Sequence, residues 1–144
     1  MRLHGRWRIQ KFSDSLLIVQ VFESWNELAF LQFSKELEEE INTMNVQKWA
    51  YIGDARDWGL AVPDSQTPLE ELYLGVEGLV CNVSVVSTSL QQTVMEKMKS
   101  PENSTVAPHY FASSITETLD ILERHDIYVD RDAVDEWFEQ GRSA

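Results

Sequence analysis

The chain has 144 residues, of which 43% are hydrophobic and 25% charged, and its net charge is −12. This composition is ordinary for a packed protein and excludes a disordered chain, and the length suits one domain with its own core. Residues 12–144 carry eight of the twelve cations and all 24 acids, so the surface repels phosphate backbones. We therefore expect neither nucleic-acid binding nor attraction to anionic membranes.

The single cysteine, Cys81, excludes an internal disulfide and a zinc site built from several thiolates. No apolar run is long enough to cross a bilayer, and the N-terminal residues lack the apolar stretch of a secretory signal. The three histidines show no metal-ligand spacing, and no glycine-rich phosphate loop is present. We expect a cytoplasmic protein with no membrane insertion, no metal site and no cofactor.

The first 44 residues predict a β-hairpin followed by a long helix. Residues 5–12 alternate polar and apolar side chains, as in a half-exposed strand, and residues 16–22 form a continuous apolar run typical of a buried strand. Ser24 and Glu27 have the spacing of a capping box, which places the helix start at Ser24. Apolar residues then recur every three or four positions as far as Met44, with acids between them.

Two further strand and helix pairs are predicted downstream. Residues 49–53 form a short buried strand, followed by a loop over residues 54–64 and a helix with Thr67 as its cap. Residues 81–87 form the next strand. A helix with Ser89 as its cap and Gln92 completing the capping box follows.

The C-terminal part adds an edge strand and two helices. Residues 109–112 predict a short strand, and Ser114 begins a helix that runs to about residue 124. A terminal helix is expected near residues 132–140. Strands that alternate with helices require crossover connections, so the sequence predicts an α/β fold with a mixed, mostly parallel sheet of about five strands.

This order of elements resembles the SpoIIAA-like fold, also called the STAS domain of anti-sigma-factor antagonists and sulfate transporters. It is most similar to bacterial SpoIIAA-like proteins of unassigned function. The hairpin before an acidic helix and the stretch HYFASSITETLDILE carry the resemblance. The likeness covers about residues 3–125 of a single domain over residues 1–144, and residues 126–144 are expected to form a helical extension.

The resemblance also indicates where a regulatory site would lie. In the signalling members, a strand ends in an Asp-Ser-(Ser/Thr)-Gly motif whose serine is phosphorylated at the start of the next helix. Asp54 matches the acid of that motif, but Ala55 and Arg56 occupy the serine positions. Thr67 is already explained as a helix cap. We therefore expect a domain without the phosphoserine switch.

The stretch 54–64 also allows a chemical interpretation. Asp54 and Asp57 are three residues apart and offer carboxylates for acid-base chemistry or for binding a divalent cation. Arg56 lies between them and neutralises them, which favours a local ion pair over a catalytic dyad. An enzyme using these two acids stays an alternative to a non-enzymatic domain.

Our first hypothesis is a regulatory or binding domain that binds a protein partner or a small apolar ligand. Loops at the carboxyl ends of parallel strands are where ligands of open α/β sheets bind. The candidate residues are therefore those of the loop after residue 53, the following helix start and the turn after the next strand: Asp54, Arg56, Asp57, Trp58, Thr67, Ser87 and Ser89. A homodimer formed through the basic N-terminal strand is a third hypothesis.

Overall fold

The structure is a computed structural model that describes residues 2–44, 47–61, 77–97 and 107–144. Its strands are β1 (Arg6–Ser13), β2 (Leu16–Trp25), β3 (Trp49–Ala61), β4 (Leu79–Val85) and β5 (His109–Ala112). Its helices are α1 (Glu27–Ile41), α3 (Ser89–Lys97), α4 (Ile115–Arg124) and α5 (Arg131–Ser143). Among these described helices, none has the length and apolar character needed to cross a membrane.

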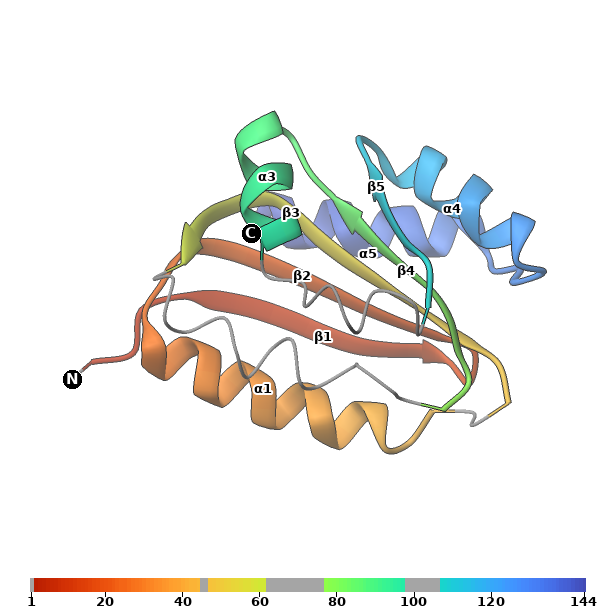
Figure 1. Ribbon diagram of the computed structural model, residues 1–144, viewed down its shortest axis with the longest axis horizontal. Helices are drawn as coiled ribbons and strands as arrows, with labels where there is room; N and C mark the ends of the chain where they lie inside the picture. The colour runs from red at the N-terminus through yellow and green to blue at the C-terminus, as the bar shows by residue number, and fades with distance from the viewer. Residues whose placement is uncertain (1, 45–46, 62–76, 98–106) are drawn as a thin grey trace.

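The strands form one sheet in the order β1-β2-β3-β4-β5. Only β1 and β2 run antiparallel, and the other neighbouring pairs are parallel. The predicted hairpin and the mixed, mostly parallel sheet are therefore confirmed. The helix α1 covers one face of the sheet, while α4 and α5 cover the other (Figure 1).

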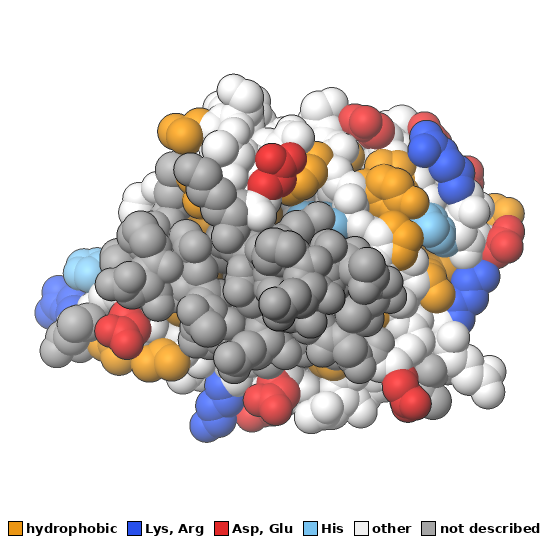
Figure 2. Space-filling model, in the orientation of Figure 1, with side chains coloured by type: hydrophobic (Ala, Val, Ile, Leu, Met, Phe, Trp, Pro, Cys, Tyr) orange, Lys and Arg blue, Asp and Glu red, His pale blue; other side chains and the backbone are white. Residues whose placement is uncertain are grey.

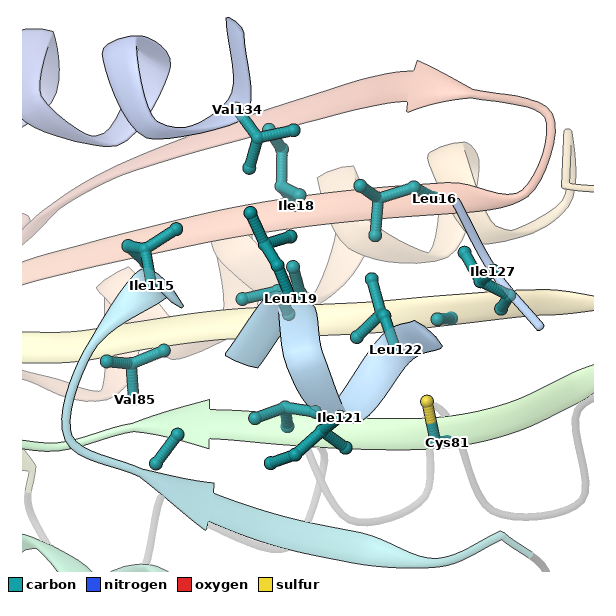
Figure 3. Packing of buried hydrophobic residues seen from close by; sticks show 14 of the residues in the cluster. Leu16, Ile18, Cys81, Val85, Ile115, Leu119, Ile121, Leu122, Ile127 and Val134 are labelled. Carbon is teal, nitrogen blue, oxygen red and sulfur yellow. The ribbon is translucent and has the colours of Figure 1, made fainter. Parts of the chain in front are cut away.

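Each face of the sheet has its own apolar core, because neighbouring residues of β2 point to opposite sides. Leu17 and Val19 pack toward Phe33 of α1. Leu16 and Ile18 belong to the other core, where they lie next to side chains of α4 (Figure 3). The buried run of β2 thus reads as continuously apolar because both of its faces are covered.

The helix α1 begins later than predicted. Its cap is Asn26, whose side chain accepts a hydrogen bond from the Ala29 backbone N–H. Ser24 is instead a residue of β2, and its hydroxyl donates to the Gly59 carbonyl at 3.0 Å. The prediction that Ser24 caps this helix is wrong, because pairing of β2 with β3 holds Ser24 in the strand.

The strand β3 is much longer than predicted. It was expected to end at Gly53, but it pairs with β2 as far as Ala61. Asp54 lies opposite Gln20 and Asp57 opposite Phe22, so two residues of β3, at positions 55 and 56, lie opposite one residue of β2. This extra residue is a β-bulge, and it bends the strand while keeping it in the sheet. The predicted loop over residues 54–64 is therefore wrong for its described part, residues 54–61.

The helix α3 also has a different cap from the predicted one. The Thr88 side chain accepts a hydrogen bond from the Gln91 backbone N–H at 3.1 Å, and the Gln91 side chain accepts from the Thr88 N–H at 3.3 Å. The capping box is thus Thr88 with Gln91, one residue before Ser89 with Gln92. The Ser114 cap of α4 is confirmed, since its hydroxyl accepts from the Glu117 N–H.

The terminal helix α5 packs against the sheet. Val134 and Phe138 are fully buried in the core that α4 also contributes to. Arg8 of β1 donates a hydrogen bond to the Trp137 carbonyl at 2.7 Å and lies 3.9 Å from the centre of its ring. The C-terminal residues are therefore joined to the N-terminal hairpin.

Candidate functional site

Asp54 and Arg56 form a buried ion pair on β3. The Nε and Nη2 atoms of Arg56 donate to the two carboxylate oxygens of Asp54 at 2.9 Å each, and the Arg56 backbone N–H adds a bond at 3.0 Å. Only 2% of Asp54 is exposed. A carboxylate held by a bidentate guanidinium in the interior has a structural role, because separating the pair leaves a buried charge.

Gln20 connects this ion pair to the C-terminal helix. Its Nε2 atom donates to Asp54 Oδ2 at 3.2 Å and to the Phe138 carbonyl at 2.6 Å, while its Oε1 accepts from Arg8 Nη1 at 2.8 Å. Burial lowers the pKa of Arg8, and the nearby charge of Arg6 lowers it further. A polar network therefore runs from β1 through β2 to β3 and α5.

The turn after β4 is tied to the backbone of β3. The Ser87 hydroxyl donates to the Arg56 carbonyl at 3.1 Å, and Gln91 Nε2 donates to the carbonyls of Arg56 and Trp58 at 3.2 and 3.1 Å. Ser87 thus lies beside Arg56 of β3. Ser89 is the first residue of α3, where its carbonyl accepts from the Thr93 hydroxyl.

Trp58 is part of the core. It is 6% exposed, and its ring packs edge to face against Trp25 and Phe30, with centroid distances of 6.2 and 6.5 Å. Its Nε1 atom has no hydrogen-bond partner among the residues that the structure describes. The expectation of a loop tryptophan is wrong, because β3 continues through Trp58 and turns the ring toward α1.

Asp57 faces a different environment, an open charged cleft where β2 and β3 end. Its carboxylate accepts from Arg142 Nε at 2.8 Å and is 39% exposed. This contact raises the pKa of Arg142. Across the cleft, Arg6 lies 3.6 Å from Glu23. We call this feature the charged cleft; its volume is about 600 Å³, and its described lining is Arg6, Phe22, Glu23, Asp57, Glu139, Arg142 and Ser143.

The two acids considered for catalysis are each paired with a guanidinium group. Asp54 binds Arg56 in the interior, and Asp57 binds Arg142 at the surface. Within the described ranges, no group of three or more His, Cys, Asp or Glu side chains is placed to hold a metal ion. Asp54 is therefore held inside the protein, whereas Asp57 stays 39% exposed in its ion pair.

The position matching the phosphorylated motif lies inside the sheet. Ala55 is 1% exposed, and Arg56 is held by Asp54. Neither of these side chains has a hydroxyl group, and Ala55 is not accessible from the surface. Thr67, the remaining candidate, lies outside the described residues.

Comparison with solved structures identifies the fold. The anti-sigma factor antagonist SpoIIAA in its unphosphorylated form aligns with a TM-score of 0.56 and 9% identity, over 82% of this chain and 98% of that chain. An uncharacterized protein of the DUF3478 family from Shewanella loihica PV-4, described as having a SpoIIAA-like fold, aligns with a TM-score of 0.58 and 13% identity. That alignment covers 85% of this chain and 96% of the other. No protein-family model and no curated protein matches the sequence.

The chain therefore has the SpoIIAA-like fold, as the order of its elements predicted. The sequence did not reveal the lining of the charged cleft other than Asp57. Arg142 is 85 residues after Asp57 in the sequence, so a local sequence pattern cannot predict their contact. The threonine and glutamine spacing at Thr88 and Gln91 was a missed signal that was visible in the sequence. Asn26, a residue type preferred at helix caps, was another.

Proposed function

We propose that this chain is a non-enzymatic binding domain that docks a protein partner at the charged cleft and has no phosphoserine switch. The observation that carries the proposal is the cleft itself, at the carboxyl ends of β2 and β3, where open α/β sheets bind their ligands. The SpoIIAA-like fold supports a regulatory or binding role in general terms.

The charges of the cleft indicate the chemistry of the partner. Arg6 and Arg142 are basic, while Glu23, Asp57 and Glu139 are acidic. Ion pairs at such exposed positions contribute little to the stability of the fold. Their charges can therefore pair with those of a binding partner without a large loss of stability. A complementary surface presents an acidic and a basic side chain side by side.

A strained residue at the rim supports the same location. Glu23 has a φ of 64°, the left-handed region that residues other than glycine rarely adopt. Strain of this kind persists where the surrounding structure imposes it and is frequent at binding sites.

Elsewhere on the surface, acidic and basic side chains are interspersed on the face seen in Figure 2.

The test compares two charge reversals of the same kind. Asp57→Arg reverses a charge inside the cleft, and Asp14→Arg reverses one in the hairpin turn, where the Asp14 side chain is 86% exposed. Each protein is used to recover its partner from a lysate of the source organism. We expect Asp14→Arg to recover the same amount of partner as wild type, and Asp57→Arg to recover at least about tenfold less. Equal recovery by two folded variants would remove the cleft as the site.

The same variants separate a partner from a second copy of the chain. Sedimentation of the purified protein measures its oligomeric state directly. If wild type is a dimer that Asp57→Arg dissociates, the partner is another copy, and a dimer unaffected by this substitution lies elsewhere. Higher salt should weaken either complex, since screening acts on exposed charges. No observation at Asp54 and Asp57 favours the enzyme alternative.

A further inference from the structure

A small cavity lies on the face of the sheet that α1 covers, separate from the charged cleft. Its volume is about 40 Å³. The described walls are mostly aromatic and aliphatic, with Trp25, Phe33 and Trp58 among the rings and Met95 of α3 on another side. Ser84 of β4 and Tyr51 of β3 are the hydroxyl-bearing residues among its described walls.

Trp58, which lines this cavity, has an unusual indole N–H. An indole N–H is a hydrogen-bond donor only, and buried donors in native proteins are paired in nearly all cases. Three other tryptophans obey that rule: Trp25 Nε1 donates to a backbone carbonyl at 2.9 Å, Trp49 Nε1 to another at 3.0 Å, and Trp7 Nε1 to Glu36 at 3.1 Å. Trp58 Nε1 is buried without an acceptor among the described residues.

Ser84, another lining residue, has a hydrogen-bond partner of its own. Ser84 Oγ lies 2.7 Å from His109 Nε2 on the neighbouring strand β5. Ser84 Oγ is therefore paired with His109, whereas the buried indole N–H of Trp58 has no acceptor among the described residues. An ion is excluded from such a site, because the apolar walls cannot replace its hydration.

The size of the cavity limits the guest further. One water molecule needs about 10–15 Å³ of such volume and two to four polar partners. A single water would therefore leave much of this cavity empty and would lack hydrogen-bond partners on its apolar walls. Drug-sized pockets begin at about 300 Å³, far above this one. Met95 is unbranched and adaptable, which gives a small guest a way to enter beside it.

We propose that this cavity binds a small, uncharged, mainly apolar molecule with one hydrogen-bond acceptor, such as a short-chain carbonyl compound, and that Trp58 Nε1 donates to that acceptor. The rings of Trp25, Phe33 and Trp58 surround the apolar part. The site is independent of the charged cleft, so loss of partner binding at Asp57 does not bear on it.

The test uses acetone and isobutene, which have nearly the same shape and differ in the acceptor oxygen. In ¹H–¹⁵N spectra of the tryptophan side chains, Trp58→Phe identifies the Trp58 signal by its absence. We expect acetone to move this signal downfield in a saturable manner, while the signals of Trp7, Trp25 and Trp49 stay in place. A Trp58 signal that does not move, or moves linearly with the other indoles, overturns the proposal.

The variant separates the hydrogen bond from the cavity. Binding to Trp58→Phe is followed through the Met95 methyl signal, which does not depend on the indole. Trp58→Phe also enlarges the cavity, a change that acts on both molecules, so we expect the ratio of acetone affinity to isobutene affinity to fall about tenfold, the value of one hydrogen bond. An equal ratio in the two proteins contradicts the role of Trp58. If Trp58→Phe does not fold, the wild-type titration decides, with the other indoles as internal controls.

Discussion

At the scale of single residues, Asp54 and Asp57 have opposite roles although they are three positions apart. Asp54 is 2% exposed and accepts from Arg56 and Gln20 inside the protein. Asp57 is at the surface and pairs with Arg142. The bulge in β3 puts both side chains on the face where α5 packs, because their partners Gln20 and Phe22 are two residues apart. Asp57 lies beside the last turn of α5, and local sequence patterns do not reveal this bulge.

Neutralising each acid in turn measures this difference. Asp54→Asn leaves Arg56 buried without its counter-charge, so we expect a loss of about 3 kcal/mol in the free energy of unfolding. Asp57→Asn removes a solvent-screened pair and should cost less than about 1 kcal/mol. Urea unfolding of the two variants gives both values. Losses of similar size would show that Asp54 is not buried as described.

Cys81 supplies a test by pH. Burial raises the pKa of its thiol from an ordinary 9.0 to about 11. The unfolded chain therefore releases this proton first, and the contribution of Cys81 to stability is complete below about pH 9 and is lost as the pH rises toward 11. Native protein should resist alkylation at pH 8, and Cys81→Ala should lack this part of the alkaline loss. Rapid alkylation before unfolding would place the thiol at the surface.

At the scale of elements, the sequence predicted which segments are strands and helices better than where they end. Periodicity and branched residues identified β1, β2 and β5, because those patterns depend on local structure. The ends of β2 and β3 depend on their pairing with each other, which local patterns do not contain. The predicted ligand loop over residues 54–64 was wrong for its described part, residues 54–61, for the same reason.

The cap of α3 gives a prediction at this scale. Thr88 Oγ1 accepts from the Gln91 N–H, whereas Ser89 already lies inside the helix. We expect Thr88→Ala to lower the free energy of unfolding by about 1 kcal/mol, the usual value of a lost cap. Ser89→Ala should be close to neutral. Thermal unfolding of the pair decides, and a larger effect from Ser89→Ala would restore the cap predicted from the sequence.

At the scale of the whole molecule, α5 closes the structure onto its first strand. Gly141 lies so close to Gln20 and Arg8 that an added Cβ would collide with both side chains. Those side chains are fixed by hydrogen bonds to Phe138 and Trp137, so moving them breaks the network. The contact joins residues more than a hundred positions apart, which explains why sequence patterns indicated only a helix here.

This contact reverses an ordinary substitution effect. Replacing glycine by alanine inside a helix normally stabilises it by about 1 kcal/mol. We expect Gly141→Ala to destabilise the protein instead, because the methyl group displaces Gln20 and Arg8. Gln140→Ala, at the neighbouring exposed position, serves as the control and should be nearly neutral. A stabilising Gly141→Ala would mean that α5 does not pack as closely as described.

The most direct test of the proposed function exchanges the charges of the cleft without removing its ion pair. The double variant Asp57→Arg with Arg142→Asp keeps opposite charges in contact but reverses their positions. We predict a midpoint of thermal unfolding close to that of wild type and an affinity for the recovered protein partner at least about tenfold weaker, measured by calorimetry. An undiminished affinity in the folded double variant would contradict the proposal that partner binding takes place at the charged cleft.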